Sequence, residues 1–113
     1  FETQEFDSPD LPNSGINMDN AFLQMLNDAR GIAGIPFNIT SGYRTKDRNK
    51  LVGGVANSSH LVGKAADIAV QSGNERYIIL NALIKAGFKR IGVAKTFLHC
   101  DNDETKPNSI WTY

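Results

Sequence analysis

Apolar residues recur along the chain with two different periods, which predicts helices and short strands in alternation. The first predicted helix follows the cap residue Asn17 and ends before Gly31, with apolar residues at helical spacing between them. The second spans residues 73–86, has the same kind of pattern and ends at Gly87. A shorter helical turn is expected over residues 46–51.

Short apolar runs bounded by turn residues predict the strands. They cover residues 37–41, 64–70, 90–94, 96–101 and 110–113, and the third and fourth are expected to form an antiparallel pair. The Gly/Ser/Asn-rich segment 53–60 is a predicted loop. Two helices interspersed with short strands indicate an α+β domain with a small antiparallel sheet. Without repeats or linkers, residues 1–113 are expected to form a single domain.

Composition and charge exclude several classes of function. Twelve basic residues balance twelve acidic ones, and no Lys/Arg run is present, so nucleic acid is not an expected partner. No apolar run reaches the roughly 18 residues of a membrane helix, and Phe1 does not open a signal-peptide pattern. Cys100 is the only cysteine, which rules out an internal disulfide.

The two histidines are the strongest indication of chemistry. His60 closes the predicted loop, and His99 lies in the strand 96–101. Strand alternation places His99 and Asp101 on one face and Cys100 on the opposite, core face. Asp67 lies in the apolar strand 64–70, where an unpaired carboxylate is costly to bury. Two imidazoles and one carboxylate form the ligand set of a catalytic zinc site. The alternative is that all three are hydrogen-bonded structural residues.

A motif favours the zinc interpretation. Ser58-x-His60-x-x-Gly63-x-Ala65-x-Asp67 resembles the S-x-H-x-x-G-x-A-x-D signature of the zinc D-Ala-D-Ala peptidases. The segments 41–45 (SGYRT) and 97–101 (FLHCD) resemble two further motifs of these enzymes, which belong to a group that includes lysostaphin-type enzymes and the hedgehog domain. The resemblance implies a hedgehog-like fold, with zinc on one face of the sheet and helices on the other.

The resemblance also implies roles for individual residues. It makes His60, Asp67 and His99 the ligands of one zinc ion per chain. It assigns Arg44 to the substrate carbonyl or carboxylate and to the oxyanion, and Ser58 to a supporting contact with the substrate or the site. The implied activity is zinc-dependent hydrolysis of a peptide bond in the peptidoglycan stem peptide, either as a D-Ala-D-Ala carboxypeptidase or as a cross-link endopeptidase.

The general base is less well defined by the motifs. Many of these peptidases carry an acidic residue three positions before the last histidine ligand, where this chain has Thr96. Asp101 shares a strand face with His99, so it is either the base or a residue that orients an imidazole N–H. Asp103 and Glu104, in a predicted turn, are further candidates for the base.

An alternative function is a non-catalytic, zinc-containing module that binds peptidoglycan or supports an assembly. Thr96 favours that alternative, whereas the lack of an evident fourth protein ligand favours an open, catalytic site. The expected partner is the stem peptide, and the protein is expected to be a monomer. It would act at the cell wall or in the periplasm, which it would reach by export or after phage lysis. Trp111 and Tyr113 are expected to pack in the core or at the sheet edge rather than to line the substrate site.

Overall fold

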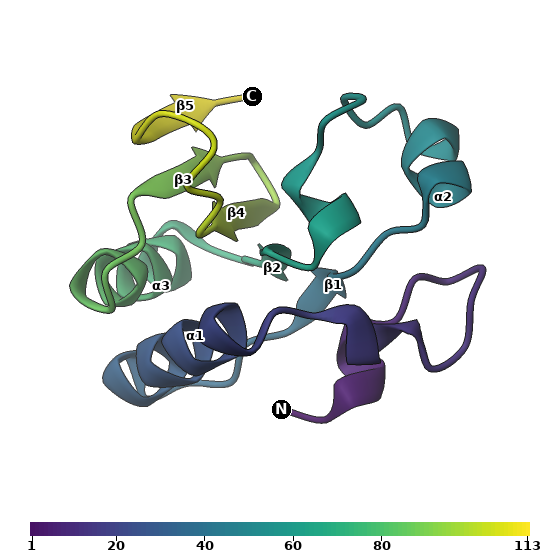
Figure 1. Ribbon diagram of the computed structural model, residues 1–113. Helices are drawn as coiled ribbons and strands as arrows, with labels where there is room; N and C mark the ends of the chain where they lie inside the picture. The colour runs from purple at the N-terminus through teal and green to yellow at the C-terminus, as the bar shows by residue number, and fades with distance from the viewer.

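A five-stranded sheet forms the centre of the computed structural model, which describes residues 1–113 (Figure 1). The strand order is β1-β2-β4-β3-β5, and every pairing is antiparallel except that of β3 with β5. The strands are β1 (Ile39–Ser41), β2 (Ala65–Ala69), β3 (Arg90–Val93), β4 (Phe97–Asp101) and β5 (Ser109–Thr112). The predicted antiparallel pair is therefore β3 and β4, and the α+β class is confirmed.

Two longer helices, α1 and α3, pack side by side on one face of the sheet (Figure 1). Two 3-10 turns, η1 and η2, precede α1, whereas α2 and η3 lie between β1 and β2. The α-helices are α1 (Asn20–Ala33), α2 (Lys46–Leu51) and α3 (Gly73–Lys85), and the 3-10 turns are η1 (Thr3–Phe6), η2 (Ser14–Asn17) and η3 (Ser59–Val62). None of these helices has the length and apolar character needed to cross a bilayer.

The ends of α1 differ from the prediction. Asn17 belongs to η2, and the cap is Asp19, whose Oδ2 accepts a hydrogen bond from the Phe22 N–H at 2.9 Å. The helix continues through Gly31, where a side chain would meet only open space. It ends at Gly34, which has a φ of +69° and so adopts the left-handed conformation that closes many helices.

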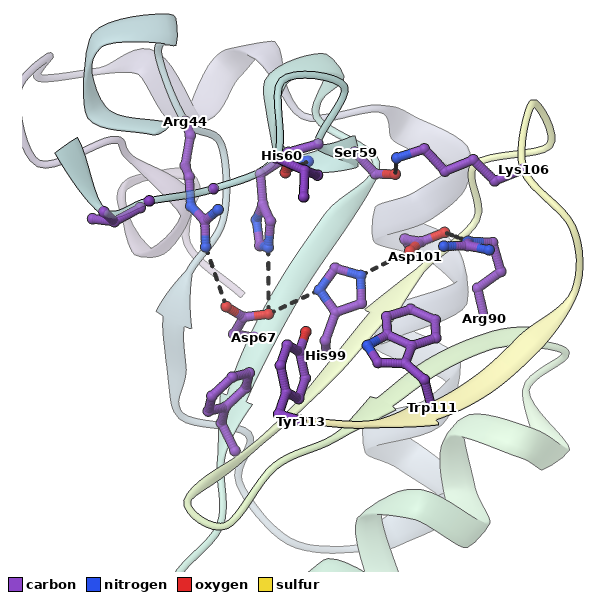
Figure 2. Close-up of a pocket in the computed structure, with 16 residues that line it drawn as sticks. Arg44, Ser59, His60, Asp67, Arg90, His99, Asp101, Lys106, Trp111 and Tyr113 are labelled. Carbon is purple, nitrogen blue, oxygen red and sulfur yellow. Dashed lines mark hydrogen bonds and ion pairs between the residues drawn. The ribbon is translucent and has the colours of Figure 1, made fainter. Parts of the chain in front are cut away.

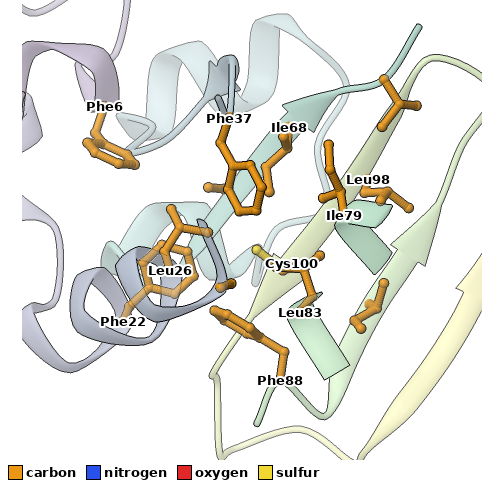
Figure 3. Close-up of a cluster of buried hydrophobic side chains, with 14 of the residues drawn as sticks. Phe6, Phe22, Leu26, Phe37, Ile68, Ile79, Leu83, Phe88, Leu98 and Cys100 are labelled. Carbon is orange, nitrogen blue, oxygen red and sulfur yellow. The ribbon is translucent and has the colours of Figure 1, made fainter. Parts of the chain in front are cut away.

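The core lies between the sheet and the two long helices (Figure 3). Ile68 on β2 and Leu98 and Cys100 on β4 point into it, and all three side chains are fully buried. Strand alternation therefore sends their neighbours Asp67, before Ile68, and His99, between Leu98 and Cys100, to the opposite face. The expected core position of Cys100 is confirmed, and the polar side chains of β2 and β4 lie on the face away from α1 and α3.

Candidate metal centre and its cleft

His60 is held in place by the backbone around it. It lies in η3, where Ser58 caps the turn and its Oγ accepts a hydrogen bond from the His60 N–H at 3.2 Å. The imidazole is 2% exposed, and Nδ1 lies 2.7 Å from the carbonyl oxygen of Gly42. Because a carbonyl can only accept, Nδ1 carries the proton and the lone pair of Nε2 is free to bind a metal. Gly63, with a φ of +70°, then turns the chain into β2.

Asp67 and His99 face each other across neighbouring strands. They are register partners in the β2–β4 ladder, and His99 Nδ1 lies 3.0 Å from Asp67 Oδ1. His60 Nε2 approaches the same oxygen at 3.3 Å (Figure 2). The structure thus brings together the three ligands that the motif predicted, from a 3-10 turn and two strands.

The three side chains fit a zinc ion. Their candidate ligand atoms all lie within 4.8 Å of one another, and each residue is buried. Tetrahedral ligands about 2.0–2.2 Å from zinc are roughly 3.3 Å apart, close to the 3.0 and 3.3 Å that separate Asp67 Oδ1 from the two imidazole nitrogens. Two imidazoles and one carboxylate also leave a fourth position for water or substrate.

The electrostatics of the cluster follow from its close contacts. Burial alone would raise the pKa of Asp67, but its interactions with the neighbouring His60 and His99 rings hold that pKa well below its usual range. Burial opposes a charge on His99, yet its bonds to Asp101 and Asp67 raise the pKa of His99 above its usual value. An ionised Asp67 is the form that binds a metal.

Asp101 lies behind His99, on the side away from Asp67 (Figure 2). Its Oδ2 is 2.7 Å from His99 Nε2, and its Oδ1 accepts from Arg90 Nε at 2.8 Å and from the Asp103 N–H at 3.2 Å. The residue is 1% exposed. Both carboxylate oxygens therefore already have partners, and one of them orients the imidazole.

Arg44 approaches the cluster from the opposite side. Its guanidinium donates to Ser41 Oγ at 3.1 Å, to Asn49 Oδ1 at 3.2 Å and to Asp67 Oδ2 at 3.5 Å. Burial lowers the pKa of Arg44, an effect that the Asp67 charge opposes; a guanidinium remains protonated at neutral pH. The predicted positive charge therefore lies beside the candidate metal ligands.

A profile of the family described as peptidase M15 matches residues 4–101. The chain belongs to the peptidase M15 family. No curated protein matches the chain. Peptidases of this family are zinc-dependent and hydrolyse peptides of the cell-wall peptidoglycan. The family predicted from the motifs is thereby confirmed, and the buried His60–Asp67–His99 cluster is consistent with zinc catalysis.

The His60–Asp67–His99 cluster of this M15 peptidase opens into a cleft of about 570 Å³. The segment 52–55 forms part of its lining, and Trp111 and Tyr113 form another part. Trp111 packs 5.4 Å from the His99 ring, and Tyr113 packs 5.2 Å from Phe97 (centroid distances). The expected packing at the sheet edge is confirmed, because β5 is an edge strand, but the expectation that these two aromatics do not line the site is wrong. Their i, i+2 spacing, which puts both on one strand face, was the available signal.

Asp103 and Lys106 form a second polar network that the sequence did not indicate. Ser59 Oγ donates to Asp103 Oδ2 at 2.7 Å, and Lys106 Nζ donates to the Asn57 carbonyl at 2.6 Å. Burial would raise the pKa of Asp103, but hydrogen bonds from Thr105 and Ser59 lower it to about 2. This network fastens the turn that carries His60 to the loop after β4. Neither Asp103 nor Glu104 lines the cleft.

Proposed function

We propose that residues 1–113 form one catalytic domain that hydrolyses a peptide bond in the peptidoglycan stem peptide with one bound zinc ion. The observation that carries the proposal is the His60–Asp67–His99 cluster, with Arg44 beside it, at the base of a cleft in an M15 peptidase. His60 Nε2, one oxygen of Asp67 and His99 Nδ1 would hold the metal. The bond is either a terminal D-Ala linkage or a cross-link.

Zinc in such a site supplies an acidified water and polarises a carbonyl. The chain's own contribution begins with Arg44, whose charge faces the same cleft as the metal ligands. It would bind the carbonyl oxygen of the scissile peptide, or the carboxylate of a terminal residue, and stabilise the negative charge that develops there. Its bonds to Ser41 and Asn49 hold the guanidinium in place before the substrate arrives.

Ser58 and Asp101 would act through the histidines. The Ser58 hydroxyl caps the turn that presents His60, so its contact supports the site. Of the two roles open to Asp101, its contacts favour orientation of His99: both oxygens are engaged, and the nearer one accepts from Nε2. A carboxylate on the second nitrogen of a metal-binding histidine fixes its tautomer and raises its basicity. Asp101 is then a positioning residue.

A non-catalytic peptidoglycan-binding module is the second candidate. Thr96, at the position where many relatives have an acid, is exposed and lies outside the cleft. The cleft's two carboxylates, Asp67 and Asp101, are both hydrogen-bonded within the site. A protein of this kind would retain zinc and bind stem peptides without cleaving them.

Digestion of purified peptidoglycan separates these functions. We expect soluble fragments whose masses identify the bond, with loss of activity on chelation and recovery on addition of zinc. Release of free D-Ala would identify a carboxypeptidase, and loss of cross-linked dimers an endopeptidase. Pull-down by intact peptidoglycan without any mass change would instead support the binding module. Sedimentation of the zinc-loaded protein tests the expected monomer, and fractionation of producing cells tests action at the wall or in the periplasm.

A further inference from the structure

The last strand brings a phenol to the metal face of the sheet. The Tyr113 N–H donates to the Val93 carbonyl at 3.3 Å, which continues the parallel pairing of β5 with β3. Its ring packs against Phe97 and lies 6.5 Å from the Trp111 ring (centroid distance). The hydroxyl end points toward Asp67 and His99 (Figure 2). A side chain far along the sequence from the zinc motif thereby reaches the same cleft.

The rings of Trp111 and Tyr113 pack directly over the backbone of Gly92. Gly92 is the register partner of His99 in the β3–β4 ladder and of Trp111 in the β3–β5 ladder. A Cβ at this position would lie 2.7 Å from Trp111 Nε1 and 2.9 Å from Tyr113 Cε2. Only bare backbone at position 92 allows both rings to lie beside the metal ligand. The position of Tyr113 therefore depends on the pairing of β4, β3 and β5.

Tyr113 and Arg44 line the same cleft, with Asp67 between them in the view of the site (Figure 2). A phenol is protonated at neutral pH, and partial burial together with the nearby Asp67 charge raises the pKa of Tyr113 further. A neutral phenol can donate one hydrogen bond. An oxygen bound above the metal ligands would have the guanidinium on one side and this hydroxyl on the other.

We propose that Tyr113 is a further catalytic residue, which donates a hydrogen bond from Oη to the substrate carbonyl oxygen that Arg44 also faces. The inference rests on the proposed hydrolytic function and extends it. Tyr113 lies beyond the residues that match the family, which end at Asp101. Two donors aimed at one oxygen stabilise the charge that develops there during hydrolysis better than either does alone.

The matched variants are Tyr113→Phe and Tyr77→Phe. Both tyrosines are highly exposed, 70% and 68%, but Tyr77 is on α3 and does not line the cleft. We expect Tyr113→Phe to lower kcat by about ten- to a hundredfold, somewhat below the usual loss of an oxyanion donor because the site is open to water. KM should rise by less than about tenfold, the range of a single neutral hydrogen bond. Zinc affinity and Tm should match the parent, and Tyr77→Phe should leave all four quantities unchanged.

A second measurement does not depend on turnover. Trp111 is the only tryptophan in the chain, so its fluorescence reports directly on the cleft. A synthetic stem pentapeptide titrated into zinc-free protein should change this emission. Tyr113→Phe should weaken the binding by about two- to tenfold, the range of a single neutral hydrogen bond. Tyr77→Phe should bind as the parent does.

The outcomes are distinct. A Tyr113→Phe variant with kcat and pentapeptide affinity within twofold of the parent would overturn the contact. A fall in kcat that is reversed by added zinc would also overturn it, because Tyr113 would then act through the metal ligands. If the parent hydrolyses no stem peptide, the proposed function fails, while the fluorescence titration still decides whether the hydroxyl touches the peptide.

Discussion

Replacing Asp101 by Asn tests how the metal centre is organised. The amide has almost the same shape as the carboxylate but has one acceptor oxygen and no charge. In the native site, the carboxylate accepts hydrogen bonds from His99 Nε2 at 2.7 Å, from Arg90 Nε at 2.8 Å and from the Asp103 N–H at 3.2 Å. One amide oxygen cannot serve all three donors, and its NH₂ group would face another donor. At least one buried donor therefore loses its partner.

The size of the effect follows from these contacts. Loss of a residue that orients a metal-binding histidine weakens metal affinity by about ten- to a hundredfold, equivalent to about 1.4–2.7 kcal/mol. The donor left without an acceptor lowers the free energy of unfolding by about 1–3 kcal/mol. Once the site is saturated with zinc, the ligands and Arg44 are unchanged. We therefore expect kcat to stay within about threefold of the parent, far from the hundredfold typical of a lost general base.

The assay is a zinc titration against a competing chelator, combined with kcat measured at saturating zinc. Asp28→Asn is the matched control, since it makes the same chemical change at an exposed carboxylate on α1 that does not line the cleft. Its zinc affinity should remain close to that of the parent. An Asp101→Asn variant with normal zinc affinity and a kcat lowered a hundredfold would refute the reasoning and make Asp101 the general base.

Three further predictions concern the metal, the guanidinium and acid stability. His60→Ala and His99→Ala should each lose zinc, and removal of zinc from the parent should lower its Tm; full zinc content in both variants by elemental analysis would contradict the ligand assignment. Arg44→Lys should reduce kcat/KM by about ten- to a hundredfold with zinc content unchanged, because an ammonium lacks the planar fork of donors; unaltered kcat/KM would return Arg44 to a structural role. The pKa of Asp103 falls from 3.8 to about 2 on folding, so its stabilisation is complete above pH 4 and is lost as the pH falls toward 2. Urea unfolding should therefore show Asp103→Asn as less stable than the parent at pH 7, with the gap closing below pH 4; a gap that persists unchanged at pH 2 would contradict this.

Local pattern in the sequence was sufficient to predict much of the fold and the three residues that cluster as candidate metal ligands. The alternation in β4 placed His99 opposite Cys100, and the short motif from Ser58 to Asp67 brought a capped turn, a left-handed glycine and a strand into one unit. These features depend on neighbours within a few residues, where backbone geometry dictates which side chains share a face. The predicted start of α1 was wrong because Asn17 and Asp19 are both good cap residues. Asn17 is the last residue of the preceding 3-10 turn, and Asp19 caps the helix.

Tertiary structure decided what surrounds the ligands. Spacing alone left Asp101 with two roles, and only the packing of Arg90 and His99 around it shows which of its atoms are engaged. The position of Tyr113 depends on the parallel pairing of β5 with β3 and on the bare backbone of Gly92. Such contacts join segments that are far apart in the chain. They are selected by how well the whole core and sheet pack together, and no local period in the sequence encodes that choice.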